Sequence, residues 1–219
     1  MTTTAEPKVA SDNTETMADL LHRLGDVPAS RVRLHPTPGT ATEADVLRIE
    51  AKENRLFELI DGVLVEKGMG FGESVLAGAI LAALRDWVKP RDLGVVAGAD
   101  GMMKLIASQV RIPDVAYFSN LRIPGGTFPE EPIPTLTPDI AVEVLSESNT
   151  KREIARKRSE YFSAGTQLVW IVDPKSLTVS VYTSPEKVTV LDKSQHLDGG
   201  NVLPGFTLSL RDLFAEIRK

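Results

Sequence analysis

The chain has 219 residues, of which 42% are hydrophobic and 25% are charged, and its formal net charge is -5. These values suit a single soluble domain with a substantial core, and they exclude a protein that coats nucleic acid through bulk positive charge. No uncharged apolar stretch approaches the ~18 residues that a membrane span needs. The lack of cysteine excludes disulfides, thiolate metal sites and a cysteine nucleophile. The polar amino terminus does not resemble a secretory signal, so we expect a cytoplasmic protein that does not associate with membranes.

The chain divides into a short tail and one domain. Residues 1–15 are polar and are predicted to be disordered, whereas residues 16–219 are predicted to form a single domain with its core at about 42–215. The predicted elements mix helices and strands without an internal repeat, which is typical of one mixed β-sheet with helices packed on it.

The amino-terminal half predicts a short helix over 17–24, a hairpin over 56–66 and a long apolar helix over 74–88. Asp61-Gly62 separates the two apolar runs of the hairpin and is a favoured two-residue turn. The hairpin and the long helix together predict a strand pair followed by a helix long enough to lie across a sheet.

The carboxyl-terminal half is richer in strands. Residues 139–146 form a near-continuous apolar run, which suits a central strand buried on both faces. The helix that follows begins with Thr150 and Glu153 in the pattern of a capping box. The predicted elements here are, in order, strands over 94–99, 102–106 and 110–118, a long loop over 123–138, the strand 139–146, a helix over 150–164, strands over 167–174, 177–183 and 187–191, and a closing strand and helix over 203–217.

Three acidic residues interrupt apolar strand faces. Alternation places Asp114 on the more apolar face of the strand 110–118, and Glu143 is the only polar side chain within residues 140–145. Glu58 likewise lies between Leu56 and Ile60 on one face of the hairpin. A buried ionised carboxylate costs several kcal/mol unless it has a cation or hydrogen-bonding partner.

Two partners for these acids remain open from the residues alone. A divalent metal ion would suit them, because Mg²⁺ is held by one or two carboxylates together with waters and phosphate oxygens. The alternative is that Asp114 begins a turn after Pro113 and that Glu143 forms a structural salt bridge with an arginine.

The predicted helix over 150–164 offers two basic residues that could reach such a site. Lys157 and Arg158 lie on or beside its apolar stripe, with Arg158 the more central of the two. A lysine suits the polarisation of an attacking water, whereas an arginine suits the gripping of phosphate.

Six segments in order resemble the Uma-two family of restriction-endonuclease-like proteins: FELIDGVLVE, RIPDVAYF, IAVEVLSES, YFSAGTQLVWIVDP, TVSVY and LPGFTLSL. The resemblance spans about residues 56–214. It implies the PD-(D/E)xK nuclease fold, a central mixed β-sheet flanked by helices within the α/β (α+β) class, here with an additional β-meander near the carboxyl terminus. It also implies that Asp114 and Glu143 bind Mg²⁺ or Mn²⁺.

The resemblance also implies the other members of the site. The lysine that the superfamily carries two residues after the glutamate is Leu145 here, and the family's substitute on the next helix corresponds to Lys157. Glu58 corresponds to an acid that assists the metal site. The implied function is metal-dependent hydrolysis of phosphodiester bonds, with DNA as the nucleic-acid partner, in a chain that could form a homodimer. The alternative is a binding module that keeps the fold without catalysis.

Two other kinds of site are disfavoured. The glycines at 68, 70 and 72 lie between a strand and a helix, but Glu73 stands where a dinucleotide fingerprint needs its third glycine and no P-loop lysine follows. The histidines at 22, 35 and 196 are scattered, so no zinc site or Ser-His triad is predicted.

Overall fold

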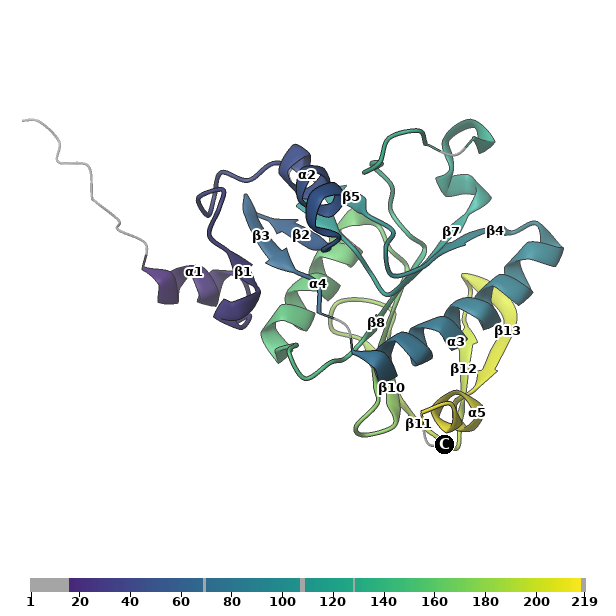
Figure 1. Cartoon of the computed structure of the whole chain (residues 1–219). Helices are drawn as coiled ribbons and strands as arrows, with labels where there is room; N and C mark the ends of the chain where they lie inside the picture. The colour runs from purple at the N-terminus through teal and green to yellow at the C-terminus, as the bar shows by residue number, and fades with distance from the viewer. Residues whose placement is uncertain (1–15, 69, 107–108, 128, 218–219) are drawn as a thin grey trace, which may run out of the picture.

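The computed structural model describes residues 16–68, 70–106, 109–127 and 129–217. The predicted disordered tail, residues 1–15, lies outside the described residues. Within the described part the chain forms helices packed around three β-sheets (Figure 1). The α-helices are α1 (Met17–Arg23), α2 (Glu43–Glu53), α3 (Phe71–Val88), α4 (Lys151–Ala164) and α5 (Leu210–Ala215). None of the helices in this part is both long enough and apolar enough to span a bilayer.

The larger sheet has six strands in the order β11-β10-β9-β8-β7-β4. Its strands are β4 (Gly94–Ala97), β7 (Val115–Ser119), β8 (Ile140–Val144), β9 (Leu168–Asp173), β10 (Thr178–Tyr182) and β11 (Val188–Asp192). Only β8 and β9 pair in parallel, and α4 is the crossover between them. Strands β9, β10 and β11 form the expected meander. The predicted mixed sheet flanked by helices is therefore confirmed, but the prediction of one sheet was wrong, because the strands divide among three sheets.

The smaller sheet has five strands in the order β1-β3-β2-β6-β5. Its strands are β1 (Val32–Arg33), β2 (Phe57–Ile60), β3 (Val63–Glu66), β5 (Met103–Ile106) and β6 (Gln109–Arg111). Asp61 and Gly62 both have positive φ, 49° and 72°, and form the tight turn predicted between β2 and β3. A third sheet, β12 (His196–Gly199) with β13 (Leu203–Ser209), adds a strand that the sequence pattern did not predict.

Two predicted elements were wrong in their extent. The segment 110–118 is two strands in different sheets: Val110 pairs with Leu59 in the smaller sheet, and Val115 pairs with Val142 in the larger one. Pro113 lies between them and has no N–H to continue a ladder, which explains the break. The helix α3 begins at Phe71 instead of residue 74, so Gly72 belongs to the helix and not to a phosphate-binding loop.

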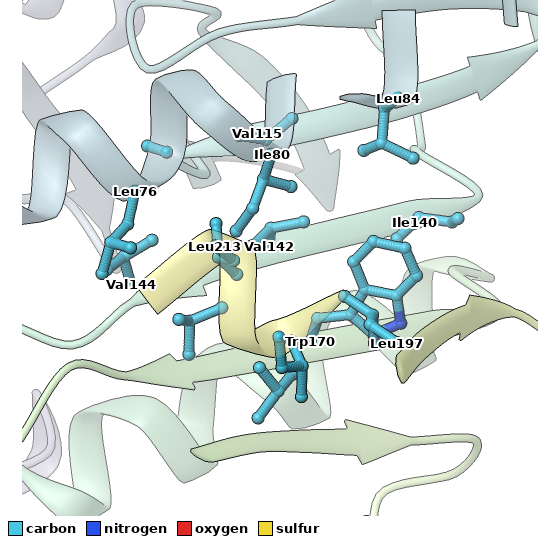
Figure 2. Packing of buried hydrophobic residues seen from close by; sticks show 14 of the residues in the cluster. Leu76, Ile80, Leu84, Val115, Ile140, Val142, Val144, Trp170, Leu197 and Leu213 are labelled. Carbon is cyan, nitrogen blue, oxygen red and sulfur yellow. The ribbon is translucent and has the colours of Figure 1, made fainter. Parts of the chain in front are cut away.

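The two faces of the larger sheet carry different helices, with α3 on one side of β8 and α4 on the other (Figure 1). On the α3 side, Leu76, Ile80 and Leu84 point into the strands and contact an apolar layer centred on Val142 and Trp170 (Figure 2). These five side chains are fully buried. The α3 side is therefore the main core, and it leaves the α4 side to carry the polar residues described below.

A matched pair of leucine substitutions tests this assignment. Leu84→Ala should lower the free energy of unfolding by about 2–5 kcal/mol, because Leu84 is fully buried and the substitution leaves a cavity. Leu121→Ala should change it by less than about 0.5 kcal/mol, because Leu121 is 96% exposed. Urea unfolding measures both, and equal effects would contradict the proposed core.

Candidate active site

The four predicted site residues come from both sheets and from α4. Glu58 lies on β2, Asp114 directly precedes β7, Glu143 lies on β8, and Lys157 lies in the middle of α4. All four are at least 95% buried. The chain thus brings four ionisable side chains from distant parts of the sequence into one buried region on the α4 side of the larger sheet.

Lys157 joins the two glutamates. Its Nζ atom lies 3.0 Å from Oε1 of Glu58 and 3.1 Å from Oε2 of Glu143. Tyr161, one helical turn further along α4, donates its hydroxyl to the other oxygen of Glu143 at 2.7 Å. Both carboxylate oxygens of Glu143 therefore have partners on the same helix, which fixes the position of α4 over β8.

A second cation, Arg111, neutralises the rest of the cluster from β6. Its Nη1 atom lies 2.8 Å from Oε2 of Glu58, and its Nε donates to Oε2 of Glu160 at 2.7 Å. The other oxygen of Glu160 accepts from Nε of Arg156 at 2.7 Å. Arg111 is 1% exposed, so its charge depends on these carboxylates and not on water.

Asp114 has a different environment, at the point where the chain passes between the two sheets. One of its oxygens accepts the backbone N–H of Val144 at 2.7 Å, and the other lies 2.8 Å from Nζ of Lys67. Lys67 also donates to the carbonyl of Ile112 at 2.6 Å. Because β7 begins only at Val115, the Asp114 carboxylate, and not a strand carbonyl, accepts the N–H of Val144.

The two glutamates that share Lys157 differ in acidity. Burial opposes ionisation of Glu58, but Lys157 and Arg111 outweigh it and lower the pKa of Glu58 to about 2. Burial raises the pKa of Glu143; Lys157 opposes that rise, while the carboxylates of Asp114 and Glu58 add to it. An additional cation beside Glu143 and Asp114 would relieve this repulsion.

The position two residues after Glu143 is occupied by an apolar side chain. Leu145 is half-buried and packs with the apolar side chains under α4, so no ammonium group reaches Glu143 from that position. The ammonium of Lys157 reaches it instead. The structure therefore places Lys157, and not Arg158, beside the acids.

Sequence reasoning missed Arg111, Tyr161 and Lys67, as well as Glu160, which pairs with Arg111. Arg111 stands between Val110 and Ile112 in an apolar run, a signal as strong as that of Glu58, and Tyr161 was assigned only to the apolar stripe of its helix. Lys67 carried no signal, because it follows the end of β3 and only the tertiary structure brings it to Asp114. The three histidines are exposed.

The donor set suits a hard divalent cation. Within residues 16–68, 70–106, 109–127 and 129–217 no three His, Asp or Glu side chains are grouped closely enough to hold a metal ion by themselves. Mg²⁺ does not need three, because it keeps several waters and is held by one or two carboxylates. Strands β7 and β8 are antiparallel and Val115 pairs with Val142. Asp114 precedes Val115 and Glu143 follows Val142, so the register places the two acids opposite one another just beyond this pair. The ammonium of Lys67 would compete with a metal ion for Asp114.

The buried charge network can be tested through stability. Arg111→Met should lower the free energy of unfolding by about 3–5 kcal/mol, because it leaves buried carboxylates without their arginine. The control is Arg48→Met, which removes a surface pair with Asp45 at a side chain 60% exposed and should cost less than about 1 kcal/mol. Urea unfolding distinguishes them, and a small loss for both would mean that the network does not stabilise the fold.

Comparison with known proteins agrees with this arrangement of strands and helices. The Uma2 family, described as "Putative restriction endonuclease", matches residues 43–211. A crystal structure from Anabaena variabilis, described as a "putative nuclease belonging to DUF820", superposes with a TM-score of 0.70 at 22% identity, over 80% of this chain and 98% of that chain. It shares the fold. No functionally curated protein matches the chain. Because the family match covers most of the chain, this protein belongs to the Uma2 family of restriction-endonuclease-like proteins.

Proposed function

We propose that this protein is a divalent-metal-dependent nuclease that hydrolyses phosphodiester bonds, with DNA as its substrate. The observation that carries the proposal is the pair of buried carboxylates, Asp114 and Glu143, which the register of β7 and β8 places opposite one another. The buried ammonium of Lys157 lies beside Glu143. The family description supports a nuclease. We further propose that it acts in the cytoplasm, and that it forms a homodimer, which light scattering of the purified protein would detect.

The residues of the cluster divide into two roles. Asp114 and Glu143 would hold Mg²⁺ or Mn²⁺, which when bound would polarise the phosphate and acidify a coordinated water. The ammonium of Lys157 would orient that water or offset the negative charge that develops on phosphate oxygens. Glu58 was expected to assist the metal site; since both its oxygens already contact cations of the chain, we assign it to positioning Lys157.

One observation favours the alternative, a binding module without catalysis. Lys67, Lys157 and Arg111 already neutralise the acids of the cluster, so the fold does not depend on a metal. The two functions differ in metal binding, because a module without catalysis has no need to bind Mn²⁺ at Asp114 and Glu143.

The proposal is tested by substituting one acid. Wild-type protein should bind Mn²⁺ in calorimetry and cleave DNA with Mg²⁺ or Mn²⁺, and Asp114→Asn should lose both, with cleavage reduced by at least about 100-fold. The control is Asp86→Asn, at an exposed position on α3, which should behave as wild type. Equal cleavage by wild type and Asp114→Asn would overturn the assignment.

Lys67 allows a second test that does not depend on catalysis. Its ammonium occupies the side of Asp114 that a metal would need, so replacing it removes a competing cation. We expect Lys67→Met to bind Mn²⁺ more tightly than wild type in calorimetry. Lys104→Met provides the control, because Lys104 pairs with Glu43 away from the site. Weaker binding by Lys67→Met would show that Lys67 supports the metal site.

A further inference from the structure

A cavity of about 350 Å³ lies beside α4. It is lined by the segment that joins β8 to α4, by one stripe of α4 and by residues of β9 and β10. The residues that matter for its chemistry are Ser146, Lys151, Arg158, Ser180 and Tyr182. Its lining contains no acidic side chain, in a protein whose net charge is -5. The cavity is therefore locally positive and suited to an anion.

Arg158 is the main charge of this cavity and lacks a counterion. Its guanidinium stacks over the ring of Tyr182, 4.3 Å from the centroid, and its buried Nε has no hydrogen-bond partner. Nowhere in the described part of the chain does a carboxylate pair with it. Its neighbours on the helix differ, because Arg152 pairs with Asp26 and Arg156 pairs with Glu160. A partly desolvated arginine without an acid partner can gain charge-assisted hydrogen bonds from a ligand.

Two further groups in the cavity can contribute. Lys151 is exposed at the start of α4, and no carboxylate among the residues described pairs with its ammonium. The hydroxyl of Ser180 has no hydrogen-bond partner in that same set. A planar guanidinium held by an aromatic ring, an ammonium and a free hydroxyl match the oxygens of a phosphate group.

The register of the larger sheet relates the cavity to the acids. Glu143 on β8 is opposite Ile171 on β9, which in turn is opposite Ser180 on β10. Ser180 therefore lies two strand spacings from Glu143, about 10 Å across the sheet. A nucleic-acid strand bound at Glu143 could reach the cavity within a few nucleotides.

We infer that this cavity binds a backbone phosphate of the nucleic-acid substrate, near the bond that is cleaved, through Arg158 and Lys151. The inference rests on the proposed nuclease function and adds a binding residue to it. Lys157 and Arg158 are adjacent on α4 but face different sites, one toward the acids and the other toward the cavity. The first would serve the reaction, and the second would hold the strand in register.

The experiment measures DNA binding without cleavage. Binding of a fluorescein-labelled DNA oligonucleotide, single-stranded and as a duplex, is followed by anisotropy in EDTA at several salt concentrations. Arg158→Gln should weaken binding about tenfold and reduce the slope of log K against log salt concentration by about 1, and Lys151→Gln should have a smaller effect. The control is Arg211→Gln, which removes an equal charge from α5 on the opposite face of the sheet. Melting temperatures should show that all variants are folded.

Each outcome decides the inference. Equal affinities for wild type and Arg158→Gln would overturn it, as would equal losses in Arg158→Gln and Arg211→Gln. Failure of wild type to bind the oligonucleotide would also overturn it. If Arg158→Gln weakened only the binding of inorganic phosphate, measured by calorimetry, the cavity would be a site for a free anion and the inference would be wrong. Mn²⁺ binding by wild type and Asp114→Asn tests the proposed function separately.

Discussion

The arrangement of this protein depends on the contacts that the ammonium of Lys157 makes with two buried glutamates. This ammonium lies between Glu58 of the smaller sheet and Glu143 of the larger one, so a single charge from α4 connects both sheets. Burying two carboxylates together is unfavourable without such a cation, because each loses its hydration and they repel one another. The same contact places a lysine beside the acids that we propose as metal ligands. Stability and the proposed chemistry therefore use the same side chain.

Much of the fold followed from local pattern. The hairpin at Asp61-Gly62, the helix that starts after Thr150 and the apolar strands β8 and β9 were predicted because turn chemistry, capping and burial act over a few residues. The break at Pro113 was missed because residues 110–118 alternate as one strand would, and only pairing with two different sheets divides them. The strand β12 was missed because its single buried apolar side chain, Leu197, gives little periodicity.

The candidate site, like the fold, could be predicted only where local sequence pattern was sufficient. Glu58, Asp114 and Glu143 stood out as acids on apolar strands, and the structure gathers them in one cluster, although their roles stay predictions. Choosing Lys157 over Arg158 required the family resemblance, because the helical pattern favoured Arg158. Lys67 could not be predicted, since its contact with Asp114 joins segments that no short-range rule relates.

The contact between Lys157 and Glu143 limits how the length of α4 ahead of Lys157 can vary. Lys157 follows Glu143 by 14 residues, and successive residues of a helix point about 100° apart. Loss or gain of one residue within α4 ahead of Lys157 would rotate the helix face, so that a neighbouring side chain would point at Glu143 in its place. Within the family, the length of this segment should thus be selected as strongly as the identity of its lysine, and insertions should accumulate elsewhere.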